Sequence, residues 1–127
     1  MTDNIPDPAI YRGAADVIRA NGWHQGSLAN SRTNGFRIAA GETALSAERL
    51  PVCLIGAINV HTSGDPWDSN DRAWGACVWM RRLVNGAPGV WNDEPERTVD
   101  EVLDLLERAA VAAESARAEA AQDGGAR

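Results

Sequence analysis

Apolar residues recur along much of the chain at the three- and four-residue intervals of a helix face. The first such stripe predicts a helix over residues 8–21, with Asp7 as its N-cap and Pro8 in its first turn. Gly22 can adopt the positive φ that ends a helix, and Trp23 then follows where it can fold back on the apolar face. We therefore expect Gly22 and Trp23 to have architectural roles.

The apolar run over residues 50–60 is compatible with a buried strand or a buried helix. Its spacing favours a helix that begins near Pro51. Gly56 costs ~1 kcal/mol in a helix interior, but it lets a neighbouring backbone approach closely. The next stripe predicts a helix that ends near Val84. Its N-cap is expected among three residues of the preceding loop: Asp68, Ser69 and Asn70.

The strongest amphipathic stripe predicts a last helix that begins after Thr98 and keeps its apolar face to Ala113. Thr98 and Glu101 have the spacing of a capping box, in which each side chain bonds the backbone N–H of the other. Beyond Ala113 the apolar face thins to alanine. We interpret residues 114–127 as a fraying helix end followed by a disordered tail.

Residues 34–39 are compatible with a short strand or one arm of a β-hairpin, with Phe36 and Ile38 on one face. A lone hairpin is stable only if it packs on other elements. The expected fold is therefore mainly α. It is a single domain over residues 1–113, built from about four helices with a short β-hairpin possible near 34–39.

Composition excludes several function classes. The net charge of −6 argues against nucleic-acid binding, which draws its affinity from cationic contacts to phosphate. No apolar run approaches the roughly 20 residues that span a bilayer, and the N-terminus lacks the features of a secretory signal. We therefore expect a cytoplasmic protein with no membrane partner. All 12 cationic side chains are arginine, which is typical of a high-GC genome.

Catalysis is the weaker of two interpretations of the polar residues. Cys53 is a candidate nucleophile with His24 as its base, and Asn92 or Asp93 could orient that base. His61 is a poorer partner for Cys53, because eight residues along one straight helix separate them by about 12 Å. Burial among apolar neighbours would raise the pKa of the Cys53 thiol and leave it inert.

No cofactor or metal is expected. The chain has no glycine-rich phosphate loop after a predicted strand. Four side chains of ligand type occur, but none has the close paired spacing of zinc motifs. These are Cys53, Cys77, His24 and His61. We interpret both cysteines as reduced and buried.

Tryptophan supplies the stronger functional signal, because it is enriched at binding hot spots. Trp74 is expected in the core and Trp79 on the opposite face of its helix, while Trp67 and Trp91 lie in polar connectors. We predict a groove shared by the turn after the first helix and the connector around Trp91. Its candidate binding residues are Trp91, Asn92, Asp93, His24, Gln25 and Asn30.

Four short motifs resemble those of small actinobacterial and actinophage proteins grouped as domain of unknown function 6197. A GW-x-QG turn (22–26), a Cys-x-x-Gly-Ala segment (53–57), a WND turn (91–93) and an RT-x-x-EVL helix start (97–103) occur in the family's order. The resemblance covers residues 8 to 113 and implies a shared fold and source, but no reaction. His24 departs from the pattern, because many members have Cys at this position.

The main hypothesis is a non-enzymatic protein-binding or regulatory module whose partner is another protein. The first alternative is the small enzyme built on Cys53 and His24. The second is an acidic phage protein that mimics nucleic acid through the stretch 93–107, although a solvated helix face explains those acids more simply.

Overall fold

The computed structural model describes residues 5–125, with their side chains to residue 122. This part of the chain forms six α-helices, one 3₁₀ turn and two isolated β-bridges. The elements are α1 Pro8–Asn21, α2 Thr33–Ala39, η1 Ala47–Arg49, α3 Leu54–Ser63, α4 Asp71–Val84, α5 Pro88–Asn92 and α6 Val99–Gly125. The mainly α architecture is confirmed. The expected count of four helices is too low, because the short helices α2 and α5 carry no helical stripe of apolar residues.

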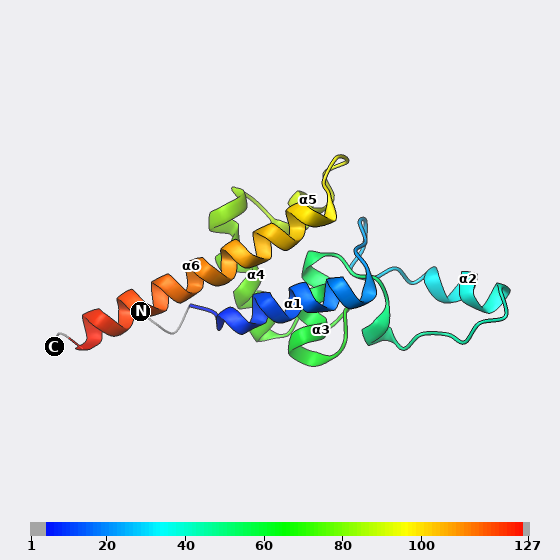
Figure 1. Ribbon diagram of the computed structural model, residues 1–127, viewed down its shortest axis with the longest axis horizontal. Coiled ribbons are helices and arrows are strands. Elements are labelled where there is room, and N and C mark those ends of the chain that lie inside the picture. Colours follow the sequence, from blue (N-terminus) through cyan, green and yellow to red (C-terminus); the bar gives the residue numbers. More distant parts are fainter. Residues whose placement is uncertain (1–4, 126–127) are drawn as a thin grey trace.

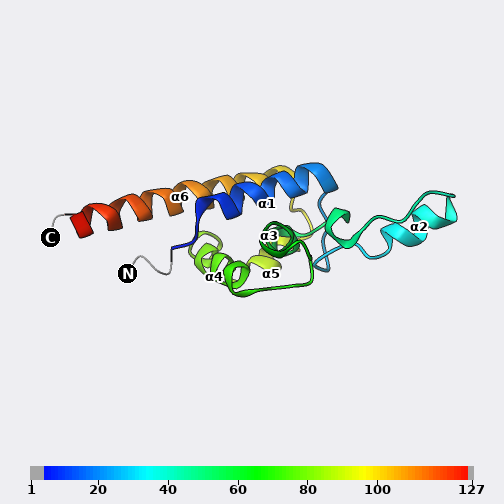
Figure 2. The ribbon, with the colours of Figure 1, turned by 90° about the horizontal axis from the view of Figure 1, so that it is seen from below.

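The helices form two layers (Figures 1 and 2). α1 and α6 run antiparallel side by side in one layer, and α3, α4 and α5 form the other. α1 makes its largest contacts with α6 and α3, so it links the layers. The core lies between them and is rich in alanine, which allows the helices to approach closely. No helix of the described residues has the length and apolar character needed to cross a membrane.

The helix boundaries that the sequence predicts from capping residues are confirmed. Asp7 caps α1 by accepting from the backbone N–H of the second helical residue at 2.9 Å. Gly22 ends α1 with a φ of 98°. Asn70, one of three candidates, caps α4. Thr98 and Glu101 form the reciprocal capping box of α6, with N–H to oxygen distances of 2.9 and 3.2 Å.

Helix α3 begins at Leu54 rather than near Pro51. The reason is a long-range pairing, since Val52 forms β-bridges with both Trp23 and Ala29 and is therefore extended. The α3 helix passes close to the opposing chain at Gly56, where a Cβ atom would overlap a neighbouring backbone carbonyl. The close approach expected at this glycine is thus confirmed.

The two tryptophans of α4 take the opposite places to those expected. Trp79 is buried, with 6% of its surface exposed, whereas Trp74 is 66% exposed. Each residue turns a helix by about 100°. Positions 76 and 79 therefore lie on one side of the predicted apolar stripe, which runs through Cys77 and Met80, and position 74 lies on its other side. The Tyr11 hydroxyl donates to the carbonyl of Ala76 at 2.7 Å, and its ring lies 6.4 Å from that of Trp79. This contact with α1 decides which flank is buried.

Helix α6 continues to Gly125, beyond the expected end of the apolar stripe. Part of its length is held by Arg12 of α1, whose guanidinium bridges Glu107 and Glu114 at 3.0 and 2.9 Å. Residues 114–125, expected to fray and then to become disordered, are helical. The last two residues of the expected tail, 126–127, lie outside the described residues.

Residues 34–39 form helix α2 instead of a hairpin arm. The predicted alternation of Phe36 and Ile38 has no sheet to pair with, and both side chains are exposed. Figure 1 shows α2 projecting from the body of the molecule, away from every other helix.

Candidate functional site

Two loops that are distant in sequence meet at one buried side chain, that of Asn92. Its Oδ1 accepts from the indole N–H of Trp23 at 2.8 Å and from the backbone N–H of Leu54 at 3.0 Å. Its Nδ2 donates to the carbonyl of His24 at 3.3 Å and to Asp93 Oδ1 at 2.9 Å. The amide therefore makes all four hydrogen bonds that it can form. We call this contact between residues 22–30, 91–94 and the start of α3 the loop junction.

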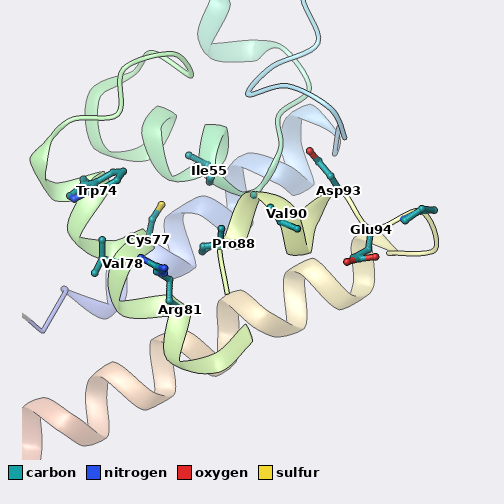
Figure 3. A pocket seen from close by; sticks show the side chains of 12 residues that line it. Ile55, Trp74, Cys77, Val78, Arg81, Pro88, Val90, Asp93 and Glu94 are labelled. Atoms are coloured by element: carbon teal, nitrogen blue, oxygen red, sulfur yellow. The ribbon is translucent and has the colours of Figure 1, made fainter. Parts of the chain in front are cut away.

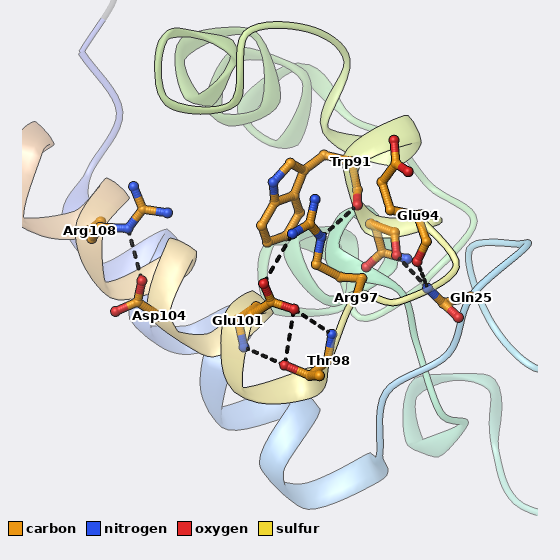
Figure 4. A network of polar contacts seen from close by, with 9 residues as sticks. Gln25, Trp91, Glu94, Arg97, Thr98, Glu101, Asp104 and Arg108 are labelled. Atoms are coloured by element: carbon orange, nitrogen blue, oxygen red, sulfur yellow. Dashed lines mark hydrogen bonds and ion pairs between the residues drawn. The ribbon is translucent and has the colours of Figure 1, made fainter.

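Gln25 and Gly26 make further hydrogen bonds across the loop junction, to residues 92–94. The Gln25 amide donates to the carbonyls of Asn92 and Glu94, at 2.9 and 2.8 Å (Figure 4). The backbone N–H of Gly26 donates to Asp93 Oδ1 at 3.0 Å. Gly26 has a φ of 98°, a conformation that glycine adopts without strain.

Arg97 joins the junction to the start of α6. Its guanidinium lies 3.8 Å from the ring centre of Trp91, and its Nε donates to the Trp91 carbonyl at 3.0 Å. A third contact runs from Nη1 to Glu101 at 3.2 Å (Figure 4). A cation stacked on tryptophan contributes about 0.5–2 kcal/mol, depending on desolvation. Trp91 is thus covered on one face.

His24 and Asn30 lie at the edge of the junction. His24 is half-buried, and its Nε2 lies 2.8 Å from the Ser27 hydroxyl. Desolvation lowers the pKa of His24, against the opposing effect of the nearby Asp93 carboxylate. The Asn30 side chain accepts from the backbone N–H of Arg32 at 3.2 Å, which closes a local turn.

The six predicted binding residues thus belong to segments that do come together. The expectation that His24, Gln25 and Asn30 face an open groove shared with Asn92 is not what the structure shows. Asn92 is fully buried, and the Gln25 amide donates to two backbone carbonyls of the facing loop. These side chains are directed inward because buried backbone carbonyls and N–H groups need hydrogen-bond partners. Only Asp93 of the six lines an apolar groove.

The candidate catalytic residues gather near this junction without forming a reactive set. The Cys53 sulfur caps α3 by accepting from the backbone N–H of Gly56 at 3.3 Å. Burial raises the pKa of the Cys53 thiol, which opposes formation of the thiolate nucleophile. Among the described side chains no hydrogen bond joins Cys53 to His24 or Asp93.

His61 is also remote from this role. It lies on α3 against Gly13 of α1, where a Cβ atom would overlap the imidazole ring. Within the part of the chain that the structure describes, no three His, Cys, Asp or Glu side chains gather as a group able to hold a metal ion.

An apolar groove lies beside the junction, between α4 and α5 (Figure 3). It has a volume of about 670 Å³. Trp74, Val78 and Cys77 of α4 form one wall, and Pro88 and Val90 of α5 form the other. The exposed fractions of Trp74 and Val90 are 66% and 67%, and that of Val78 is 43%. Large apolar side chains on both walls therefore face solvent.

The groove has charges of opposite sign at its two ends. Arg81 lies at one end, and Asp93 and Glu94 lie at the other (Figure 3). Cys77 is 8% exposed, and burial, aided by the nearby Cys53, raises the pKa of its thiol to about 12. Cys77 therefore contributes apolar surface to the groove rather than a nucleophile.

The sequence pattern does not identify the groove residues. Val90 stands in a polar connector, and Pro88 resembles a helix breaker, although proline also suits a first helical turn. Trp74 is expected in the core on its spacing alone. One feature of the sequence could have indicated the groove. Trp74 and Val78 are four residues apart and lie together beside the apolar stripe of α4, outside the stripe itself.

The model of the family of unknown function DUF6197 matches residues 2–112, so the chain belongs to that family. No curated protein matches the chain, and no solved structure does. The four short motifs singled out in the sequence meet at the loop junction. They supply the Asn92 hydrogen bonds, the close approach at Gly56 and the stack of Arg97 on Trp91.

Proposed function

We propose that this member of the DUF6197 family is a non-enzymatic protein-binding module whose contact surface is the α4–α5 groove. One observation carries the proposal: Trp74, Val78 and Val90 present exposed apolar surface to the same groove. Large contiguous apolar patches are uncommon on monomeric proteins, and those that occur often mark interaction sites. Tryptophan is among the residues that contribute most to binding energy.

The shape and charge of the groove favour a helical or extended apolar segment of a partner protein. Two helices form the walls, and an amphipathic segment can bury its apolar side chains between them. Arg81 at one end and the carboxylates of Asp93 and Glu94 at the other would favour one orientation of that segment.

The loop junction supports this role by fixing one wall of the groove. α5 is only five residues long, and such a short helix has little stability of its own. Its last residue, Asn92, accepts a hydrogen bond from the backbone N–H of Leu54 at the start of α3. The residue before it, Trp91, is held by the stacked guanidinium of Arg97. A wall held in place before binding loses less conformational entropy when a partner docks.

The two alternative functions gain no comparable support. The enzyme hypothesis lacks a hydrogen-bonded nucleophile and base. The acidic-mimic hypothesis requires unpaired carboxylates over residues 93–107. Three carboxylates of this stretch each pair with an arginine: Glu101, Asp104 and Glu107.

Site-specific photo-cross-linking tests the proposal. A photoreactive amino acid replaces Val90 in the groove, and in the control it replaces Val111, an exposed residue of α6. Both proteins are irradiated in an actinobacterial lysate, and adducts are identified by mass spectrometry. We expect one defined protein adduct from position 90, absent from position 111 and lost when Trp74→Ala is added. Equal adducts at both positions, or none at position 90, would refute the groove as a protein-binding surface.

A further inference from the structure

A second unpartnered apolar element lies at the far end of the molecule. Residues 31–46, which we call the arm, leave the body and carry helix α2 at their outer end (Figures 1 and 2). No residue of the arm is buried. Phe36 is 74% exposed and Ile38 is 63% exposed, although both are large apolar side chains. The arm therefore has apolar surface that no residue of the described part of its own chain covers.

The arm has a defined conformation rather than that of a loose loop. The Asn34 side chain donates to the carbonyl of Leu45 at 2.8 Å and accepts from the N–H of the same residue at 2.6 Å. Arg37 Nε donates to the carbonyl of Thr43 at 2.7 Å. These bonds tie the outgoing and returning segments of the arm together. Its exposed apolar side chains are consequently held on an ordered element before any partner binds.

The arm and the groove match in shape. Phe36 and Ile38 are two residues apart, so they lie on nearly opposite sides of α2. An element with apolar side chains on both sides fits between two walls better than on a flat surface. The α4–α5 groove offers such walls, with Trp74 and Val78 on one side and Val90 on the other.

The arm and the groove also match in charge. Arg32 and Arg37 lie in the arm, and neither forms an ion pair with a carboxylate in the described part of the chain. The α5 end of the groove carries the carboxylates of Asp93 and Glu94. Arg32 precedes α2, whereas Glu42 follows it, and the Glu42 N–H donates to the Arg37 carbonyl at 2.8 Å. Pairing of Arg32 with the two carboxylates and of Glu42 with Arg81 at the other end of the groove favours one direction of docking.

We infer that the arm of one copy of this chain docks in the α4–α5 groove of a second copy. Both views show the arm directed away from α4 and α5 of its own chain, which form the groove, so a second molecule is the source of the contact. Reciprocal docking about a two-fold axis uses both arms and both grooves and closes the assembly as a dimer. The inference rests on the proposed function, since it names the occupant of the same groove.

Sedimentation velocity of the purified full chain tests the inference. The arm is short, so the contact is small and the dimer is expected to be concentration-dependent. Wild type should approach twice the 13.6 kDa of one chain as its concentration rises. Phe36→Asp in the arm and Val90→Asp in the groove should each remain monomeric. The control Val111→Asp, on the exposed face of α6, should dimerise like wild type. Circular dichroism should show unchanged helix content in all three variants.

Mixing the two interface variants distinguishes arm-to-groove docking from other self-association. A Phe36→Asp chain keeps its groove and a Val90→Asp chain keeps its arm, so the mixture regains one intact contact. We expect dimers in the mixture that neither variant forms alone. A monomeric wild type at its solubility limit would overturn the inference, as would a dimer that survives either single variant. If wild type is monomeric while position 90 still cross-links to a different protein, this inference fails and the proposed function stands.

Discussion

The indole N–H of Trp23 donates to the side-chain oxygen of Asn92 at 2.8 Å, across 69 residues of sequence. This bond joins the turn after α1 to the end of α5. The same oxygen accepts from the N–H of Leu54, so three segments depend on one side chain. Asn92 is fully buried, and a buried polar group that makes all its hydrogen bonds fixes one arrangement of its neighbours. We therefore regard the loop junction as the structural support of the groove, and not as a contact surface itself.

Gln25 and His24 are adjacent, but they should differ in their effect on stability. Gln25→Ala removes two donors to backbone carbonyls that join the loops, so we expect a loss of about 1–3 kcal/mol in the free energy of unfolding. His24→Ala removes one contact to the Ser27 hydroxyl and should change it by only about 0.5 kcal/mol. Urea unfolding followed by circular dichroism measures both. Equal effects would mean that Gln25 does not join the loops.

Two helical glycines should respond in opposite directions to alanine. A Cβ atom on Gly56 would overlap the carbonyl oxygen of Leu28, and backbone cannot move aside cheaply, so Gly56→Ala should destabilise by about 2 kcal/mol or more. A methyl group added at Gly75 of α4 would meet nothing within 4 Å, so Gly75→Ala should stabilise by about 0.5–1 kcal/mol. Thermal melts of the two variants compare them directly. A neutral Gly56→Ala would contradict the close approach of the two chain segments.

Acid should weaken the contact between α1 and α6. Hydrogen bonds from Arg12 lower the pKa of Glu107 and of Glu114 in the folded chain. Their contribution to stability is therefore present above the unfolded pKa of about 4.3 and is lost as the pH falls through the lower folded values. In Arg12→Ala, the melting temperature should therefore fall less steeply as the pH is lowered below about 4.3. Arg19→Ala removes a local pair with Asp16 and only a minor influence on the pKa of Glu107, so it should change the acid dependence of the melting temperature much less than Arg12→Ala does.

Neither cysteine should react readily in the native protein. Burial raises the pKa of the Cys53 thiol, and it raises that of Cys77 to about 12, so little thiolate forms near neutral pH. We expect iodoacetamide to label both residues only after denaturation, as read by peptide mass spectrometry. Native labelling of Cys53 with an apparent pKa below the reference of about 8.5 would instead revive the enzyme hypothesis.

Local signals in the sequence predict the local parts of the fold. Asp7, Asn70 and the Thr98–Glu101 box mark helix starts because a cap forms within a few residues of the helix that it begins. The apolar spacing places the start of α3 too early. Val52 is held extended by its bridges to Trp23 and Ala29, and such long-range pairing leaves no periodic signal.

The candidate site is only partly predictable for the same reason. The sequence groups the segment around Gln25 with the one around Asn92, and the structure brings them together. It does not reveal that Asn92 is buried, since an asparagine in a polar connector is usually exposed. Trp74 and Trp79 flank one stripe almost symmetrically, and only the contact of Trp79 with Tyr11 on α1 decides between them.

A double-mutant cycle on Trp23 and Asn92 tests the central claim most directly. Trp23→Phe removes the indole donor, Asn92→Ala removes its acceptor, and the free energy of unfolding in urea is measured for both variants, their combination and wild type. We predict that Asn92→Ala alone costs about 3 kcal/mol, because it leaves the donors of Trp23 and Leu54 without a partner. We also predict a coupling energy of about 1–2 kcal/mol between the two positions. Additive effects within about 0.5 kcal/mol, with an Asn92→Ala protein as stable as wild type, would contradict the claim that the loop junction supports the fold.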